Sequence, residues 1–317
     1  MEVRHMRAFM AVAEERNFTR AARRLNMAQS PLSQQIRALE REIGVSLFTR
    51  TTRTVSMTYP GEVLYKRVAE LLALADDAVE ASRKAARGHL GQLSIGFTGS
   101  ATHELLPPLV RAYADRYPDV TLDVRSDLTT PVQVEQLLTG ELAVGVLRPP
   151  VVANGLAVET IRHEPVVVLL ANRHHRTVDR DIDLADLRDE WFISLPDNPP
   201  ATMYSLMLTA CRAAGFVPKI RQTVSDSTAL VALVAGDMGI ALVPASMRHF
   251  AISGATFRPL RAPGVTVSLA LAYRESNVTP LIRQFLETAR TVVQSRTTAE
   301  PPALSTPYED SRYSIGF

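Results

Sequence analysis

Five polar side chains near the amino terminus have the types and spacing expected of a surface that reads DNA. They are Gln29, Ser30, Ser33, Gln34 and Arg37. Amides and hydroxyls can bind base edges in a major groove, and a guanidinium can bind a base or a phosphate. At helical spacing these residues share one side of their segment. The other side carries an apolar stripe at spacings of three and four residues, formed by Leu32, Ile36, Leu39 and Ile43.

The segment has signals for the start and end of a helix. We expect Ser30 to be the N-cap and Pro31 to take the first helical position, where a missing N–H group costs nothing. Gly44 ends the helix, and residues 45–58 then alternate like a short hairpin, or wing. The basic residues of this hairpin, candidates for phosphate or minor-groove contacts, are Arg50 and Arg53.

The helix that carries the five polar residues is the candidate recognition helix, and two further helices are predicted to hold it in place. A helix over about residues 19–25 contains the small residues Ala21 and Ala22, which allow close approach, and a helix over about residues 3–15 forms the third wall. The former helix also offers two candidate DNA contacts, Thr19 and Arg20. The alternative is that these polar faces and wing arginines are solvated surface without a ligand.

The motif from Phe18 to Arg53 is F-x-x-A-A-x-x-L-x-x-x-Q-S-P-L-S-x-x-I-x-x-L-E followed by G-x-x-L-F-x-R-x-x-R. It resembles the winged helix-turn-helix of LysR-type transcriptional regulators. The resemblance covers residues 1–60 almost without a gap and extends more weakly to about residue 292. It implies a sequence-specific regulator of transcription, not an enzyme, whose activity responds to a small-molecule effector.

Charge is concentrated at the end of the chain that carries this motif. Residues 1–60 hold ten Arg and five acidic residues, residues 61–90 hold five of each sign, and the remainder holds 20 basic and 23 acidic residues. These sums of +5, 0 and −3 give the formal net charge of +2. A basic amino-terminal domain is expected of a protein that docks on a polyanion.

Residues 61–90 are predicted to form a linker helix that makes a dimer. Between Gly61 and Gly88 the sequence contains neither Pro nor Gly. An apolar seam repeats every three or four residues, a pattern that favours a helical partner. The seam consists of Leu64, Val68, Leu71, Ala75 and Ala78, followed by Ser82 and Ala85. Packing on the protein's own carboxy-terminal domain is the alternative; in the resembling family this helix makes the dimer.

The rest of the chain alternates predicted strands and helices, which indicates an α/β domain with βαβ units. The expected strands are 93–97, 120–125, 142–147, 166–170, 191–194, 240–243, 257–260 and 265–273. The expected helices are 103–117, 131–138, 202–214, 228–235 and 280–293. The predicted fold class is thus multidomain: an all-α winged helix-turn-helix domain, a long linker helix and an α/β domain.

The family resemblance implies that this third domain, residues 91–294, is a two-lobed, periplasmic-binding-protein-like (type 2) effector domain. Lobe one would be 92–161 plus 268–292, and lobe two would be 162–267, with crossovers near Ile161 and Ser268 as hinges. Residues 295–317 are polar, contain Pro and lack periodicity, and we expect them to form a disordered tail.

Hydroxyl-bearing segments precede several helices of this domain, and helix N-termini bind anions. The resemblance implies that such segments line the cleft between the lobes and bind a small carboxylate. The candidate effector-binding residues are Ser100, Thr102, Thr129, Thr130, Asn198, Met203 and Ser227, with Arg148 as a counter-charge. The alternative for each is an ordinary helix cap, worth about 1 kcal/mol.

Other features exclude several classes of function. The single cysteine, Cys211, is expected to be a buried structural thiol, and the pair His174-His175 has no accompanying Cys or acidic ligand spacing, so neither a metal nor a cofactor is expected. Apolar runs are too short to span a bilayer and no signal peptide is evident, which favours a cytoplasmic protein, associated with the nucleoid when bound to DNA.

Two other functions compete with an effector-responsive regulator. An enzyme is disfavoured because the sequence lacks G-x-S-x-G, P-loop and G-x-G-x-x-G motifs. An architectural DNA-binding protein would not need the large carboxy-terminal domain. The expected partners are double-stranded DNA, a second copy of the chain, a small-molecule co-effector and, from the resemblance, a homotetramer and RNA polymerase; no membrane partner is expected.

Overall fold

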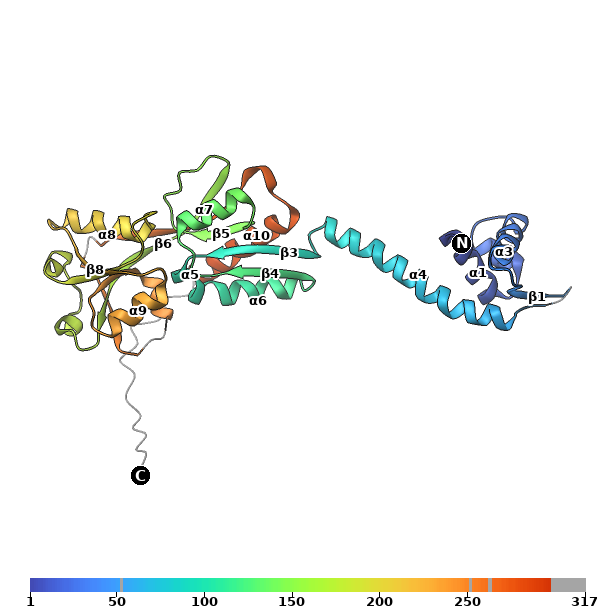
Figure 1. The fold of residues 1–317 in the computed structure, drawn as a ribbon, viewed down its shortest axis with the longest axis horizontal. Coiled ribbons are helices and arrows are strands. Elements are labelled where there is room, and N and C mark those ends of the chain that lie inside the picture. Colours follow the sequence, from blue (N-terminus) through green and yellow to red (C-terminus); the bar gives the residue numbers. More distant parts are fainter. Residues whose placement is uncertain (52–53, 251–252, 262–263, 298–317) are drawn as a thin grey trace, which may run out of the picture. The chain divides into compact units, whose positions relative to one another are not determined.

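The computed structural model describes residues 1–51, 54–250, 253–261 and 264–297. It divides into two compact units, Met1–Ala86 and Arg87–Phe317 (Figure 1). Arg53 and the predicted tail beyond residue 297 lie outside the described residues. The predicted tail begins too early, because residues 295–297 still belong to the last helix.

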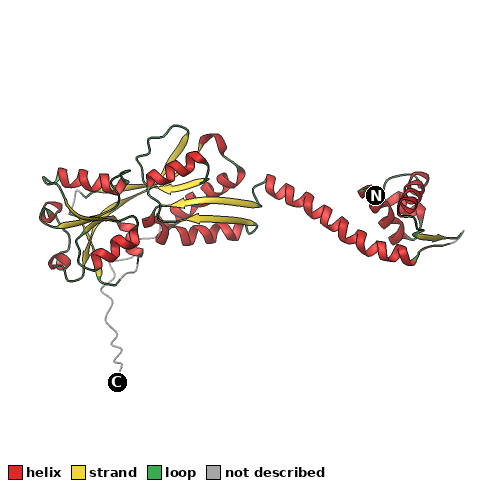
Figure 2. Ribbon diagram, in the orientation of Figure 1, coloured by secondary structure: helices red, strands yellow, loops and turns green. Residues whose placement is uncertain are grey.

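The amino-terminal unit consists of helices followed by a hairpin and a long helix (Figure 2). Its elements are α1 (Val3–Glu15), α2 (Phe18–Arg24), α3 (Gln29–Ile43), β1 (Phe48–Arg50), β2 (Val55–Met57) and α4 (Tyr59–Ala86). The antiparallel pair β1–β2 is the predicted wing. All three predicted helices of the motif are present, each with bounds within two residues of those expected.

The start of α3 differs from the prediction. Its N-cap is Ala28, not Ser30, and no side chain caps it. Ser30 and Pro31 therefore lie inside the first turn. Proline is tolerated throughout that turn because the first amides of any helix lack an intrahelical acceptor, so Pro31 did not fix the boundary.

A single apolar core holds the three helices and the wing together. Leu32, Ile36 and Leu39 of α3 are fully buried, whereas Ile43 is 39% exposed, so the predicted stripe ends one turn early. Phe48 of the wing packs with its ring centroid 5.3 Å from that of Phe9. The hairpin is thus anchored to α1 through aromatic contact, in a range where such pairs are favourable.

The predicted dimer seam of α4 is partly used inside the unit. Val68 is completely buried in the amino-terminal core, and Leu64 packs against the same core. Val68 is therefore wrongly assigned to a dimer interface, because a side chain without accessible surface cannot contact a second copy. The large aliphatic side chains that α4 leaves exposed are Val63 (50%), Leu71 (46%), Leu74 (67%) and Val79 (50%), and Tyr59 at the start of the helix is 79% exposed.

The second unit is an α/β domain. Its strands are β3 (Gly91–Phe97), β4 (Val120–Arg125), β5 (Val144–Leu147), β6 (Leu156–Ala171), β7 (Trp191–Ser194), β8 (Lys219–Thr223), β9 (Ala241–Pro244), β10 (Ala255–Pro259) and β11 (Thr266–Arg274). Its α-helices are α5 (Gly99–Glu104), α6 (Leu106–Arg116), α7 (Thr130–Thr139), α8 (Thr202–Ala213), α9 (Ser227–Ala235) and α10 (Pro280–Thr297). Short 3₁₀ turns are η1 (His175–Val178), η2 (Leu184–Leu187), η3 (Ala245–His249) and η4 (Glu275–Asn277).

Two long strands join the two halves of this domain. The order of the main sheet is β10-β6-β11-β5-β3-β4, with β9 also paired to β6, and β7 and β8 form a separate parallel pair. Strand β6 pairs antiparallel with β11 over Leu156–Pro165 and then with β9 and β10. The predicted crossovers near Ile161 and Ser268 thus fall within paired strands. We call β3–β5 with their helices lobe one, and β7–β10 with α8 and α9 lobe two.

Successive side chains of β11 point to opposite faces of the sheet and pack into two different apolar cores. Leu269 and Leu271 of β11 face the core formed with α6 and α10, whereas Ala270 and Ala272 face the core that includes Leu137 of α7. Figure 1 shows α6 and α7 on opposite sides of the strands. The candidate pocket lies at the carboxyl ends of β3 and β5, beside the starts of α5, which follows β3, and α7, which follows β4.

The predicted secondary structure needs three corrections in this unit. β6 begins ten residues earlier than expected, at Leu156, because its first half alternates partly exposed residues and lacks an apolar run. The predicted helix 103–117 is two helices, α5 and α6, and β8 was not predicted. No helix among the described residues has the length and apolarity to cross a membrane.

Candidate DNA-binding surface and ligand pocket

The predicted DNA-reading residues form an exposed face on α3. Gln29, Ser30, Pro31, Gln34 and Arg37 are exposed, and Ser33 is half-buried. The buried stripe on the other side fixes the rotation of the helix, so this polar face is held outward. Within the described part of the chain, Arg37 makes no ion pair, which leaves its guanidinium available to a phosphate or base.

The two candidates from α2 have partners within the unit. The Thr19 hydroxyl donates to Gln29 Oε1 at 3.1 Å, which joins α2 to the start of α3. Arg20 pairs with Glu15 through Nε at 3.2 Å and remains 63% exposed. Thr19 thus lies beside the α3 face, whereas the contact of Arg20 is with the end of α1, and both residues remain on the surface.

The wing residue Arg50 has a structural contact that the sequence did not indicate. Its guanidinium lies 4.6 Å from the ring centroid of Phe18 and pairs with Glu40 at 3.2 Å. The other carboxylate oxygen of Glu40 accepts the backbone N–H groups of Leu47 and Phe48, at 2.9 and 3.3 Å. Glu40 thus ties the recognition helix to the wing, and Arg50 stabilises that joint.

A pair of adjoining cavities lies between lobe one and lobe two. The first, about 470 Å³ including its mouth, is lined mostly by apolar residues, and we call it the apolar cavity; the second, about 340 Å³ including its mouth, is lined mostly by hydroxyl-bearing and charged residues, and we call it the polar cavity. Both are lined by Thr98, Leu195, Met203 and Ser227. The first adds Ser100, Ile193, Ser194, Met207, Leu230, Leu242, Val243, Pro244 and Met247. The second adds Gly99, Asp127, Leu128, Thr129, Thr130, Arg148, Ala201, Thr202 and Ser225.

The pocket brings together most of the predicted effector-binding residues. Thr129 has no hydrogen bond from its hydroxyl among the described residues and is free to contact a ligand, as is the Ser227 hydroxyl. The hydroxyls of Thr130 and Thr202 donate to the Arg148 carbonyl, at 2.9 and 2.8 Å.

Two predicted residues do not line the pocket. Asn198 is exposed, and Thr102 is half-buried with its hydroxyl bonded to the Thr98 carbonyl at 3.2 Å. Thr202, Met207 and Asp127 line the pocket and were missed. In the sequence, Asp127 and Thr202 are marked only by lying near the start of a predicted helix. Met207 is marked only by lying on the apolar side of one.

Arg148 is a buried partner within the protein, not a free counter-charge. Its side chain is 2% exposed and lies 2.8 Å from the Glu164 carboxylate. Its Nη2 and Nε also donate to the Ser100 hydroxyl, at 2.7 and 3.1 Å. Burial lowers the pKa of Arg148, and the nearby Glu164 carboxylate partly offsets this. The guanidinium therefore orients Ser100, which lines the apolar cavity.

Glu164 connects the two lobes at the crossover. Its Oε1 faces Arg148 and, at 3.4 Å, Arg162. Its Oε2 accepts the Ser246 backbone N–H at 2.7 Å, a contact with the other lobe. Burial alone would raise the pKa of this carboxyl, but the Arg148 charge and hydrogen bond, with Arg162 and the Ser246 amide, hold it below its usual value.

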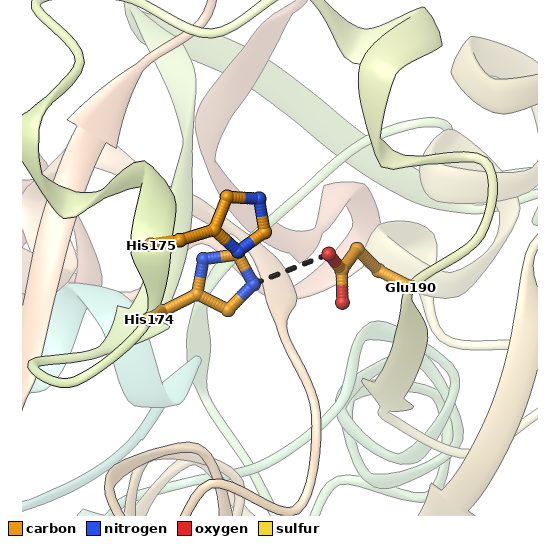
Figure 3. Close-up of side chains that lie close together, drawn as sticks. All are labelled: His174, His175 and Glu190. Carbon is orange, nitrogen blue, oxygen red and sulfur yellow. Dashed lines mark ion pairs between the residues drawn. The ribbon is translucent and has the colours of Figure 1, made fainter.

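The histidine pair acquires an acidic neighbour that the sequence did not reveal. Ligand atoms of His174, His175 and Glu190 lie within 4.8 Å of one another, and His174 Nε2 is 3.3 Å from Glu190 (Figure 3). His174 Nδ1 accepts the Arg176 N–H at 3.3 Å, which puts the proton of a neutral ring on Nε2. The two rings stack at 23°. In this arrangement the two ring planes are nearly parallel, so the ring lone pairs do not point to one common position, and the geometry favours a capped turn with a His–Glu contact.

Cys211 is a buried side chain in the core of lobe two, as predicted. Burial raises the pKa of its thiol to about 12. A thiol in this environment stays protonated and is a poor nucleophile.

Two family models match the chain over nearly its whole described length. The model described as "Bacterial regulatory helix-turn-helix protein, lysR family" matches residues 3–62, and "LysR substrate binding domain" matches residues 86–294. The chain therefore belongs to the LysR family.

Relatives and solved structures agree with this assignment. The chain is 39% identical over 286 residues to the HTH-type transcriptional regulator AlsR of Bacillus subtilis (strain 168), covering 90% of this chain and 94% of that protein. It is 36% identical over 291 residues to BudR of Raoultella terrigena, covering 90% and 99%. The crystal structure of CbnR, a LysR family transcriptional regulator, superposes with a TM-score of 0.79 at 30% identity, covering 91% and 100%. A structure of full-length CbnR with its target DNA gives a TM-score of 0.78 at 30% identity, covering 92% and 100%.

Proposed function

We propose that this regulator binds an operator through the α3 face and that a small carboxylate in the interlobe pocket modulates its activity. The observation that carries the DNA-binding surface is the division of α3. Leu32, Ile36 and Leu39 are buried in the core, while Gln34 and Arg37 are exposed. A helix so divided presents amide and guanidinium donors to a groove, and CbnR has been crystallised with its target DNA.

The carboxylate is supported by the helix N-termini at the polar cavity. Helices α7 and α8 start beside it with Thr129 and Ala201 as N-caps, and neither makes a side-chain cap bond. Their first amides thus have no capping side chain, and the helix dipoles favour an anion at this end. The apolar cavity next to it, lined by Met203 and Met207, suits a hydrocarbon body.

A homo-oligomer is supported by the exposed aliphatic side chains of α4, of which Leu74 is the most exposed, at 67%. A second copy that covers them would present two α3 faces to two half-sites. Tetramer formation, contact with RNA polymerase and association with the nucleoid stay predictions.

Calorimetric titration of the full-length protein with monocarboxylates tests the effector site. Thr129→Val removes a hydroxyl without other hydrogen bonds and should weaken binding about tenfold, near the value of a hydrogen bond to a charged group. Asn198→Ala, outside the pocket, is the control and should leave affinity unchanged. Wild-type affinity in Thr129→Val, or no binding of any carboxylate, would contradict the proposed site. DNA binding followed by fluorescence anisotropy should change when the bound carboxylate is added.

A further inference from the structure

One carboxylate of the chain itself lies in the polar cavity. Asp127, between β4 and α7, has a left-handed backbone with φ of 59°. Its Oδ1 and Oδ2 accept the backbone N–H of Ser227, at 3.1 and 3.3 Å. Ser227 is the first residue of α9, so a carboxylate of lobe one occupies the start of a helix in lobe two.

The fit around this carboxylate is tight. A Cβ atom added to Gly99 would lie 2.0 Å from Asp127 Oδ1 and 2.1 Å from Ser227 Oγ. Asp127 therefore packs against the backbone of α5 as well as against α9. The side chain is held in place, because three segments converge on it.

The charges around Asp127 are unfavourable to a second anion. Within the described ranges Asp127 has no ion-pair partner. Among the residues that the structure describes, Arg148 is the one basic residue lining either cavity, and it is already paired with Glu164. Asp226, the residue before Ser227, lies outside the cavity lining and caps α9 by accepting the Ala229 N–H at 2.8 Å. The polar cavity thus contains the carboxylate of Asp127, and its arginine is neutralised.

We infer that Asp127 determines the specificity of the effector site by admitting ligands with one carboxylate and rejecting dicarboxylates. The inference rests on the proposed carboxylate effector. A single carboxylate can take the uncapped starts of α7 and α8. A second one reaching the α9 amide would have to share it with Asp127, and like charges brought together in a partly desolvated site repel strongly.

Matched ligand pairs test this in the full-length protein by calorimetric titration. The pairs are butanoate against butanedioate, and benzoate against benzene-1,4-dicarboxylate. In whichever pair contains a ligand of the wild type, the wild type should bind the monocarboxylate at least about tenfold more tightly than the matching dicarboxylate. In Asp127→Asn an oxygen still accepts the Ser227 N–H, but the charge is gone. Dicarboxylate affinity should then rise by about tenfold or more, while monocarboxylate affinity changes less than about threefold.

Two further variants keep the test decisive. Asp127→Gly also tolerates the left-handed backbone and replaces the Asn variant if that one folds poorly. Asp226→Asn removes a neighbouring charge that lies outside the cavity lining, and should leave the preference unchanged. Equal binding of both ligand classes by the wild type, an unaltered preference in folded Asp127 variants, or an equal gain in Asp226→Asn would overturn the inference. Binding of neither class by any variant, with DNA binding intact, would instead refute the proposed carboxylate effector, and this inference with it.

Discussion

At the scale of residues, an arginine beside a pocket need not bind the ligand. Arg148 follows a strand whose carboxyl end reaches the pocket, which made it a reasonable counter-charge. The structure instead surrounds its guanidinium with Glu164, Ser100 and the Ser268 carbonyl. A buried arginine needs such partners because an unpaired buried charge is strongly unfavourable.

The buried ion pair between Arg148 and Glu164 should make the stability of the folded protein depend on pH. The pKa of Glu164 is depressed in the folded protein, so its stabilisation is fully present above the unfolded value of about 4.3 and is lost as pH falls through the folded value. Glu164→Gln should lower stability near neutral pH by about 3–5 kcal/mol, because Arg148 is left buried without a counter-charge. Thermal unfolding followed by circular dichroism from about pH 7 to about pH 3 should show a smaller acid-induced decline in the variant. Parallel declines would argue against a role for this carboxyl in acid sensitivity.

If the exposed face of α3 reads the operator, substitutions on it should weaken specific DNA binding. Arg37→Ala and Gln34→Ala should each weaken operator binding by about 10- to 100-fold, the range for a base contact. Fluorescence anisotropy with a genomic fragment retained by the protein measures this. Arg221→Ala, an exposed arginine of the effector unit, is the matched control. Undiminished specific binding in both α3 variants would refute the face assigned here.

At the scale of elements, the sequence indicated most helices and strands but few of their contacts. Periodicity located α1, α2, α3 and α10 because each buries one side. It missed β8, where no residue is fully buried, since an exposed strand carries no apolar pattern. Pairings such as Asp127 with Ser227, 100 residues apart, leave no local signal. The exposed face of α3 could be predicted because its residues are close together in the sequence. The partners of Arg50 and Arg148 could not, because they lie in other elements of the chain.

The joint between α4 and the wing depends on a glycine. A Cβ atom at Gly61 would lie 2.2 Å from the Leu47 carbonyl oxygen, a backbone atom with little freedom to move. Gly61→Ala should therefore destabilise the amino-terminal unit by about 1–3 kcal/mol, as overpacking does. Gly236→Ala, where the nearest atoms are 3.4 and 3.5 Å away, is the control. Differential scanning calorimetry measures both, and equal melting temperatures for the two variants would contradict this account.

At the scale of the whole molecule, association should depend on the exposed side of α4. Leu74→Glu places a charge where we expect a second copy, and should shift the oligomer towards monomers with at least about a tenfold weaker association. Light scattering coupled to size-exclusion chromatography reports the mass. Val178→Glu, at a side chain 86% exposed on the effector unit, is the comparison. Wild-type mass for Leu74→Glu at low micromolar concentration would exclude α4 as the main interface.

The pairing of β6 with β11 along Leu156–Pro165, interrupted by one irregularity, limits how an effector signal can leave the pocket. A slip of one residue would turn every side chain to the opposite face, so the register between Leu156 and Pro165 cannot change. Stretching would break the hydrogen bonds of the ladder. The motion left to the ribbon is torsion, focused where the register shifts between Leu269 and Ala270. We therefore expect a bound effector to change the angle between the two lobes rather than the distance between them.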